Sequence, residues 1–385
     1  MASSPAKPLV VLAAGGTGGH VFPAEALAAE LSSRGYQLAL VTDRRGGDLS
    51  GRLGELETHR VRAGGIAGKG VFARILSAIE LTVGTVQAWF LLRRLKPAVV
   101  VGFGGYASVP TMLAAAYSGI KAAIHEQNSV LGRANRMLAS RVETIATSFE
   151  KVSEIPENAK SNIIVTGMPV RLAVTIVRDR AYPSISREGD INLAVFGGSQ
   201  GAHIFSVVVP DAMKRLDESL RRRIKITQQS RQEDIDLANS VYRTIGIEAE
   251  LSTFFNDVPD RIADAHLVIC RSGASSIAEL TTIGRPAILV PYRHAVDDHQ
   301  SRNAHAVDEA GGGWLIPEKA FTGVVLAERL AALFAIPRIL ENAATAAKSA
   351  GVPDAAARLA DMVVGLMSNG NGKSDPDTTN QRAAA

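Results

Sequence analysis

Residues 271–300, which read RSGASSIAELTTIGRPAILVPYRHAVDDHQ, contain the pattern that decides the fold. An apolar run at residues 267–270 precedes this segment, and a second apolar run, residues 287–290, ends at a proline. Together they predict a strand, a tight turn, a helix and another strand of an α/β sheet. Ligands bind such sheets at the carboxyl ends of the strands, where helix N-termini attract anions. The turn is therefore a candidate site for a nucleotide diphosphate.

Glu279, within the predicted helix, has two interpretations. Residues 276–279 read SIAE and fit S-x-x-E, the capping box in which Ser276 and Glu279 satisfy each other's backbone donors. Acidic residues in dinucleotide-binding folds instead accept hydrogen bonds from a ribose diol. The pattern alone leaves both roles open for this carboxylate.

The composition indicates two globular domains. The chain has 385 residues, 46% of them hydrophobic, which is enough for two ordinary cores. Its net charge of +4 and 5% aromatic content argue against nucleic acid as a partner. Cys270 is the one cysteine, which excludes an internal disulfide and a cysteine metal cage, and its place in an apolar run predicts an inert buried thiol.

Neither end of the chain carries an export or membrane signal. Residues 1–8 lack the apolar core of a signal peptide, and no apolar run reaches the ~18 residues that span a bilayer. We therefore expect a cytoplasmic protein. Residues 368–385 are rich in Asn, Gly, Asp and Thr without periodicity, which predicts a disordered tail.

Two similar glycine-rich loops divide the chain into halves. The apolar run 9–13 leads to GGTGGH at residues 15–20, and the run 193–196 leads to GGSQGAH at residues 197–203. This self-similarity predicts two Rossmann-like, doubly wound parallel-sheet domains facing each other across a cleft. We expect them at residues 7–168 and 169–350, with a C-terminal helix over about 352–367. Further apolar runs predict strands at residues 38–42, 98–102, 122–125, 144–146 and 224–227.

The first glycine loop ends at His20, at the start of a predicted helix. The positive end of the helix favours a neutral imidazole, which suits a general base, although a capping or plain surface histidine fits the same pattern. A nicotinamide enzyme is the rival interpretation, because Asp43 ends the second strand. The G-x-G-x-x-G pattern that starts at Gly16, however, would place Val21 where the third glycine belongs.

Two polar or glycine-rich clusters follow other strands of the first half. The sequence GFGGYAS at residues 102–108 has more glycines than a turn needs, so we expect a phosphate or sugar to approach Gly104, Gly105 and Tyr106 closely. The sequence HEQN at residues 125–128 follows the next strand. Its side chains either face a ligand or bridge neighbouring loops.

Residues 69–96 carry an apolar stripe at helical spacing, with basic residues around it. The stripe consists of Phe72, Ile75, Leu76, Ile79, Val83, Val86 and Phe90, with Trp89 beside it, and the basic residues are Lys69, Arg74, Arg93, Arg94 and Lys96. Core packing explains such a stripe, and so does a patch that binds an anionic membrane leaflet.

Taken together and in this order, the motifs resemble the MurG family of bacterial N-acetylglucosaminyltransferases. The matching segments are GGTGGH (15–20), GFGGY (102–106), HEQN (125–128), GMPVR (167–171), GGSQGA (197–202) and RSGASSIAE (271–279). The resemblance covers about residues 8–365. It implies a GT-B fold whose C-terminal helix crosses back to the first domain, and it implies transfer of N-acetylglucosamine from UDP-N-acetylglucosamine (UDP-GlcNAc) to lipid I, giving lipid II for peptidoglycan.

The resemblance also implies a set of site residues. The donor residues are Thr17, Gly18, Gly19 and Asn128 in the first domain, Arg171 and Ser199 at the diphosphate, Phe255, Ala274, Ser275, Ser276 and Ile277 near the uracil and phosphates, Glu279 at the ribose, and Gln300 at the sugar hydroxyls. Met168 and Phe255 depart from the family pattern, where Asn and Ile are common, but neither removes a charged group.

The implied reaction inverts the anomeric carbon of the donor. The muramyl 4-hydroxyl of lipid I attacks from the face opposite UDP and gives a β-1,4-linked product, with His20 as the candidate base. No Asp-x-Asp pattern marks a metal site, so we expect no fixed cofactor, and at most assistance from a divalent cation such as Mg²⁺. The expected location is the cytoplasmic face of the plasma membrane, bound peripherally.

Three alternatives remain at this point. Another GT-B lipid glycosyltransferase would differ in its acceptor, a UDP-sugar 2-epimerase would need no acceptor, and a non-catalytic UDP-sugar sensor would not need His20. The peptide stem of lipid I, the oligomeric state and contacts with other cell-wall synthesis proteins stay open.

Overall fold

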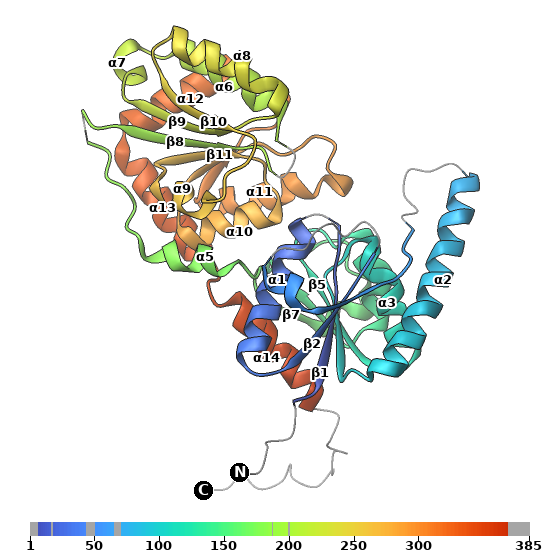
Figure 1. Ribbon diagram of the computed structural model, residues 1–385. Helices are drawn as coiled ribbons and strands as arrows, with labels where there is room; N and C mark the ends of the chain where they lie inside the picture. The colour runs from blue at the N-terminus through green and yellow to red at the C-terminus, as the bar shows by residue number, and fades with distance from the viewer. Residues whose placement is uncertain are drawn as a thin grey trace, which may run out of the picture.

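The computed structural model describes residues 7–16, 18–43, 51–64, 71–186, 188–198 and 201–368. These residues form two α/β domains, each with helices on both faces of a parallel sheet (Figure 1). The first sheet has the strand order β3-β2-β1-β4-β5-β6-β7, and the second has the order β10-β9-β8-β11-β12-β13. Strand order reverses beside β1 and beside β8, as in doubly wound folds. The prediction of two such sheets is confirmed.

The first sheet and its helices occupy the N-terminal part of the chain. The elements are β1 (Leu9–Ala13), α1 (Gly18–Ser33), β2 (Gln37–Thr42), η1 (Gly51–Glu55), β3 (Glu57–Arg60), α2 (Val71–Leu95), β4 (Val99–Gly102), α3 (Gly105–Tyr117), β5 (Lys121–Glu126), α4 (Arg133–Leu138), η2 (Ala139–Arg141), β6 (Thr144–Thr147), η3 (Glu157–Asn162) and β7 (Ile163–Val165).

The second sheet and its helices follow. The elements are α5 (Leu172–Ile176), η4 (Val177–Asp179), β8 (Ile191–Phe196), α6 (His203–Arg215), α7 (Glu218–Arg221), β9 (Ile224–Gln229), α8 (Gln232–Thr244), β10 (Glu248–Ser252), α9 (Val258–Asp264), β11 (Leu267–Cys270), α10 (Ala274–Ile283), β12 (Ala287–Leu289), η5 (Val296–Asp298), α11 (His299–Glu309), β13 (Gly313–Leu315), α12 (Gly323–Ala335), α13 (Pro337–Ala350) and α14 (Ala355–Ser368).

The central strands were predictable because they are buried on both faces. All four residues of β4, β6 and β11 are buried, and β4 and β11 are apolar runs of the sequence. By contrast, β3, β7, β10 and β13, which we did not predict, are the edge strands of the two sheets. Most of their residues are exposed or half-buried, so they lack a continuous apolar run.

Helix α14 packs on the first domain, although it follows the second domain in sequence. It lies beside α1 (Figure 1), and its Leu359 and Val363 are buried in the core that contains strand β1. The Lys121 ammonium donates a hydrogen bond of 2.6 Å to the carbonyl of Leu366. Ser368, which we expected in the tail, is the last residue of α14; residues 369–385 lie outside the described part of the chain.

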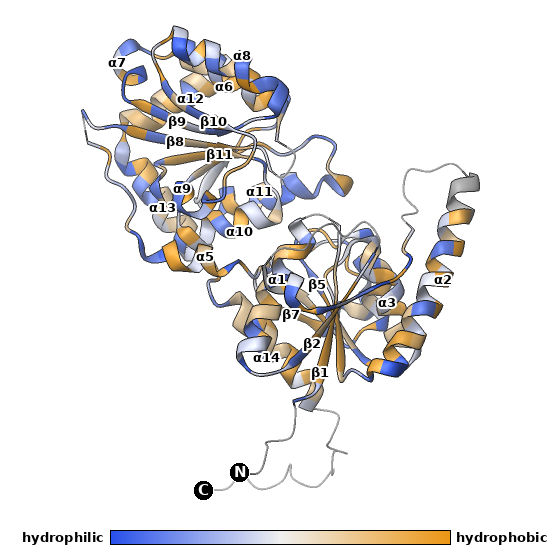
Figure 2. Cartoon of the chain, in the orientation of Figure 1, coloured by the Kyte–Doolittle hydropathy of each residue, from blue (hydrophilic) through white to orange (hydrophobic). Residues whose placement is uncertain are grey.

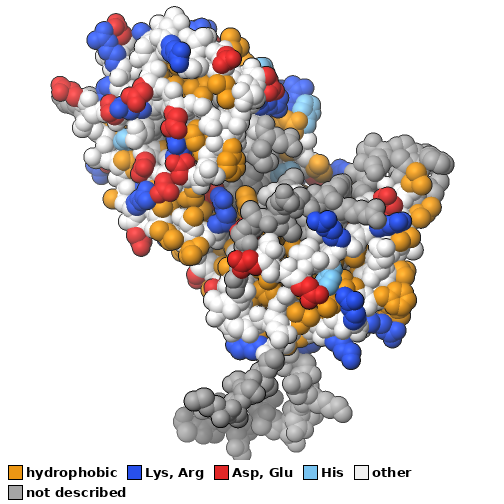
Figure 3. All heavy atoms as spheres, in the orientation of Figure 1, with side chains coloured by type: hydrophobic (Ala, Val, Ile, Leu, Met, Phe, Trp, Pro, Cys, Tyr) orange, Lys and Arg blue, Asp and Glu red, His pale blue; other side chains and the backbone are white. Residues whose placement is uncertain are grey.

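The apolar stripe of α2 is largely an exposed surface rather than core. Leu76, Ile79, Val86 and Phe90 are 50%, 54%, 49% and 63% exposed. Figure 2 colours several positions along this helix as hydrophobic, and Figure 3 shows hydrophobic side chains on the surface of this part of the molecule. The buried face carries the small residues Ser77, Gly84 and Ala88 together with Leu92. At Gly84, an added Cβ would lie 1.8 Å from the carbonyl oxygen of Arg62, so the neighbouring backbone leaves no room for a side chain. The core-packing interpretation is therefore wrong for these four residues.

No helix within the described ranges combines the length and the apolar character needed to cross a membrane.

Candidate active site

His20 lies where three loops of the first domain meet. Strands β1, β4 and β5 are neighbours in the sheet, so the loops at their carboxyl ends converge. The imidazole Nδ1 of His20, in the first turn of α1, is 3.1 Å from Oε1 of Gln127. On another side of the ring are Gly104 and Gly105, with φ of 79° and 67°, a region that favours glycine. A Cβ at Gly105 would lie 3.2 Å from His20 Cδ2.

Residues of the HEQN segment have two different roles: some bridge neighbouring loops, and one faces the second domain. Glu126 is 1% exposed and accepts hydrogen bonds from the backbone N–H groups of Asn128 and Gly132 and from the side-chain amides of Asn128 and Asn135. Gln127, also 1% exposed, bonds to the loop after β4 through the carbonyl of Phe103. Glu126 and Gln127 therefore bridge loops. Asn128 reaches the boundary between the domains.

Asn303 of α11 joins the two domains at this boundary. Its amide nitrogen donates to Oδ1 of Asn128 at 3.0 Å and to the carbonyl of Ser272 at 3.2 Å. Its Oδ1 accepts from the backbone N–H and the hydroxyl of Ser129, both at 2.9 Å. Nearby, Asp297 pairs with Arg133 and Arg136 of α4. The carboxyl ends of β5 and β11 are thus held together.

Arg171 and Glu279 form an ion pair next to α1. Arg171 Nη2 donates to Glu279 Oε1 at 3.0 Å, and the guanidinium lies 4.5 Å from the ring centroid of Phe22. Burial raises the pKa of the Glu279 carboxyl, and the Arg171 charge opposes part of that rise. Arg171 Nε is buried without a hydrogen-bond partner. Because Phe22 is two residues beyond His20, this pair adjoins the His20 loop.

The N-terminus of helix α10 has hydrogen-bonding groups that lack a side-chain partner. Its N-cap is Gly273, and no side chain caps it, so Ser276 lies inside the helix. The capping-box interpretation of Ser276 and Glu279 is therefore wrong. The hydroxyl of Ser275 is buried without a partner. This N-terminus is suited to an anion, because its first N–H groups lack a capping side chain.

The remaining predicted residues lie around these groups. Ala274 and Ile277, on α10, are buried. Gln300, on α11, accepts a 2.9 Å hydrogen bond from the Tyr292 N–H through Oε1, and its carbonyl accepts from the Ser272 hydroxyl. Gly18 and Gly19 start α1, and Tyr106 is in the first turn of α3. Thr17 and Ser199 lie outside the described residues.

Phe255, expected near the uracil and phosphates, has a ring that is largely buried by other side chains. Its ring is 7% exposed and packs edge-on against Phe196, with centroids 6.4 Å apart. The guanidinium of Arg261 lies 4.1 Å from the ring centroid of Phe255. The ring is thus occupied by protein contacts.

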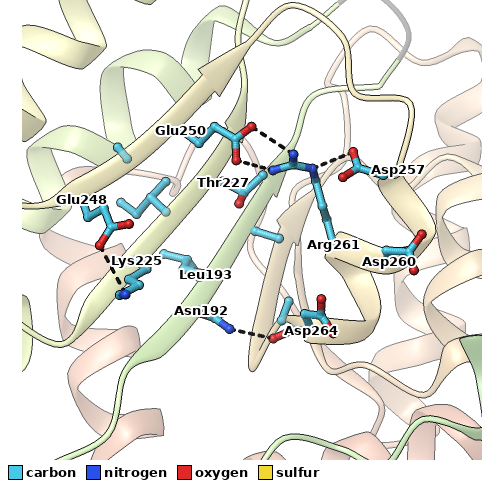
Figure 4. A pocket seen from close by; sticks show the side chains of 14 residues that line it. Asn192, Leu193, Lys225, Thr227, Glu248, Glu250, Asp257, Asp260, Arg261 and Asp264 are labelled. Carbon is cyan, nitrogen blue, oxygen red and sulfur yellow. Dashed lines mark hydrogen bonds and ion pairs between the residues drawn. The ribbon is translucent and has the colours of Figure 1, made fainter.

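A surface pocket on the second domain lies at the opposite ends of the strands from the loops around His20 and α10, although Arg261, which lines it, also contacts Phe255. It covers the starts of β8, β9 and β10 (Figure 4), whereas the loops above follow the carboxyl ends of strands. Its charged side chains pair with one another; Arg261, for example, bonds both Glu250 and Asp257. No group of three or more His, Cys, Asp or Glu residues suited to a metal occurs in the described part of the chain.

Sequence reasoning missed Gln127 as a partner of His20, and it missed Asn303 and Asp297. The last two act across the domain boundary, and nothing in the local sequence identifies a residue's partner in another domain. Gln127 belongs to the HEQN motif, but its contact with His20 depends on how the loops converge.

Comparison with known proteins identifies the family. The glycosyltransferase family 28 N-terminal domain matches residues 10–147, and the C-terminal domain of the same family matches residues 192–359. A relative from Paramagnetospirillum magneticum, named UDP-N-acetylglucosamine--N-acetylmuramyl-(pentapeptide) pyrophosphoryl-undecaprenol N-acetylglucosamine transferase, is 57% identical and covers 95% of this chain and 99% of its own. The protein of the same name from Rhodospirillum rubrum is 55% identical, over 92% of this chain and 91% of its own.

Solved structures agree with this assignment. Acinetobacter baumannii MurG is 28% identical with a TM-score of 0.75, over 93% of this chain and 99% of that chain. The UDP-GlcNAc 2-epimerase from Neisseria meningitidis has a TM-score of 0.63 at 14% identity, over 94% and 100%, which shows a shared fold alone. The predicted GT-B fold is confirmed, and this chain belongs to the MurG family of glycosyltransferases, within glycosyltransferase family 28.

Proposed function

We propose that this protein transfers N-acetylglucosamine from UDP-GlcNAc to the muramyl 4-hydroxyl of lipid I, the undecaprenyl-pyrophosphoryl-MurNAc-pentapeptide, and so makes lipid II. The names of its relatives support the donor and the acceptor. The observation that carries the proposal is the position of Arg171, which pairs with Glu279 and stacks on Phe22. That contact brings a candidate nucleotide site in the second domain against α1, the helix whose first turn carries His20.

The donor binds at α10 and the groups beside it. Glu279 accepts hydrogen bonds from the ribose diol, as acidic residues do in related sheets. The diphosphate lies at the N-terminus of α10, where the unpartnered Ser275 hydroxyl and the free Nε of Arg171 are available as donors. Gln300 and Asn128 bind the sugar of the donor, and the loop of Gly104, Gly105 and Tyr106 lies beside the acceptor.

His20 acts as the general base. The muramyl hydroxyl loses its proton to His20 as its oxygen bonds to the anomeric carbon, while the bond to UDP breaks. A positioned base is typically worth ~10²- to 10⁴-fold in rate. The leaving diphosphate gains negative charge, which the Arg171 guanidinium and the α10 N-terminus stabilise more in the transition state than in the ground state.

The exposed face of α2 binds the membrane that holds lipid I. An apolar groove lined by Thr85, Val86, Trp89, Phe90, Ala114 and Tyr117 lies between α2 and α3. Arg93, which stacks on Trp89, and the exposed Arg94 place positive charge beside it. A contiguous apolar surface with basic neighbours suits an anionic leaflet, so the protein binds the membrane peripherally.

Release of UDP from UDP-GlcNAc, measured with and without a soluble lipid I analogue, tests the proposed function. We expect release only with the analogue. Equal release without it would indicate hydrolysis and would refute the transferase. Tight UDP binding with no release under either condition would indicate an epimerase or a sensor.

A further inference from the structure

The polar side chains behind His20 fix the direction of every hydrogen bond between them. We propose that Gln127 is a positioning residue that holds His20 in a single tautomer, with the proton on Nδ1 and the lone pair of Nε2 free to accept a proton. The inference deepens the proposed function, because it assigns the atom of His20 that acts as the base.

The orientation of the Gln127 amide follows from its backbone neighbours. Its Nε2 lies 3.0 Å from the carbonyl oxygen of Phe103 and 2.9 Å from that of His125. Carbonyl oxygens only accept hydrogen bonds, so the group facing them is the NH₂ group. A rotated amide would place Oε1 against two oxygens in a site where Gln127 is 1% exposed. The other end of the amide, Oε1, therefore faces His20.

The tautomer of His20 follows from that orientation. Its Nδ1 lies 3.1 Å from Gln127 Oε1, which carries no hydrogen. A hydrogen bond between these two atoms requires a proton on Nδ1. In the neutral ring, Nε2 is then the unprotonated nitrogen, as a general base needs.

His125 supports the same arrangement from behind. Its Nε2 lies 3.1 Å from the carbonyl of Gly167, so Nε2 carries the proton, and the unprotonated Nδ1 faces Gln127 Nε2 at 3.1 Å. There it shares the two hydrogens of the Gln127 NH₂ group with the carbonyls of Phe103 and His125. Complete burial lowers the pKa of His125 to about 4, which keeps the ring neutral near pH 7. A protonated His125 would turn an N–H toward the Gln127 NH₂ group and break the chain of bonds.

The glycine loop completes the setting of the imidazole. An added Cβ at Gly105 would lie 3.4 Å from His20 Nε2, and one at Gly104 would lie 3.5 Å from Cε1. Because both residues lack a side chain, the loop packs against the ring without covering Nε2. The imidazole is thus held on the Nδ1 side by Gln127 and left approachable at Nε2.

The test measures the tautomer directly, by nitrogen NMR of the full-length protein with ¹⁵N-labelled histidine. The signals of His20 are those missing from the spectrum of His20→Gln, among the eight histidines of the chain. At a pH where His20 is neutral, we expect a pyrrole-type Nδ1 and a pyridine-type Nε2. The reverse assignment in the wild-type protein would overturn the inference, whatever the variants do.

Gln127→Met removes both polar atoms at nearly constant volume. We expect mixed tautomers of His20 and an unchanged Kd for UDP. We also expect a kcat reduced about ten- to a hundredfold, because the substitution removes part of the rate enhancement that a positioned base contributes. Gln228→Met is the matched control: Gln228 is equally buried, in the second domain, and bonds Ser206, Ser230 and Tyr242. It loses buried hydrogen bonds too, but the His20 signals should not change.

The outcomes separate this inference from the proposed function. An unchanged His20 tautomer in folded Gln127→Met would overturn the positioning role. If the tautomer changes as expected but His20→Ala keeps a near-normal kcat, the tautomer assignment stands and the base role of His20 fails. If Gln127→Met does not fold, the wild-type spectrum still decides the tautomer, because that measurement needs no substitution at Gln127.

Discussion

Replacing Gly105 with alanine tests whether the geometry around His20 limits catalysis. The new methyl group would lie 3.2 Å from His20 Cδ2 and 3.4 Å from Nε2, so the ring must move by a few tenths of an ångström. A misplacement of 1 Å can cost about a hundredfold in rate, so a shift of this size corresponds to a kcat about three- to tenfold lower. The φ of 67° also costs alanine about 1–2 kcal/mol of folding stability.

Gly119→Ala is the control for the cost to the backbone. Gly119 has the same φ of 67°, but an added Cβ meets no atom within 4 Å. Both variants should lose about 1–2 kcal/mol in chemical denaturation, and only Gly105→Ala should lose kcat, measured at saturating donor and acceptor. Equal kcat values in the two variants would refute the idea that the Gly105 loop sets the position of His20.

Three further predictions concern other parts of the molecule. Glu279→Gln should weaken UDP binding about ten- to a hundredfold, because a charged hydrogen bond to the ribose is lost; an unchanged UDP Kd in calorimetry would remove Glu279 from the ribose. Burial lowers the pKa of His125 from 6.5 to about 4, so between these pH values His125 is protonated in the unfolded chain and neutral in the folded protein. About 3 kcal/mol of folding stability should therefore be lost as pH falls through that window, and none above it. In chemical denaturation, the folding stability of His125→Gln should depend less on pH in this window than that of the wild-type protein. Equal pH dependence of the two proteins would contradict the lowered pKa of His125. Arg93→Glu with Arg94→Glu should weaken binding to anionic vesicles about tenfold or more, whereas the same reversal at Arg221 and Arg222 in the second domain should not; equal binding by both double variants would argue against the α2 surface.

The sequence predicted the centre of each sheet and missed its edges. Strands such as β4 and β11 are buried on both faces and therefore appear as apolar runs, which a local pattern can identify. Strand β3, with residues Glu57, Thr58, His59 and Arg60, is mostly exposed and pairs with β2 only. Its strand conformation comes from pairing with a neighbour, which a local pattern does not contain.

The candidate site was predictable as a set of loops but not as a set of contacts. Parallel topology brings the carboxyl ends of neighbouring strands together, so the glycine loops and HEQN were expected to meet. The S-x-x-E pattern at Ser276 was misleading because the helix begins earlier, at Ala274 with Gly273 as its N-cap, and the pattern does not determine the first residue. The stripe on α2 repeated at helical spacing, but spacing alone does not tell which face of a helix meets the core.

The most direct measurement of the central claim is the linkage formed by the purified protein from UDP-GlcNAc and a soluble lipid I analogue. We predict a single new disaccharide, with N-acetylglucosamine joined β-1,4 to the muramyl sugar, and one UDP released for each linkage. An α-linked product, or release of UDP with no disaccharide, would contradict the account.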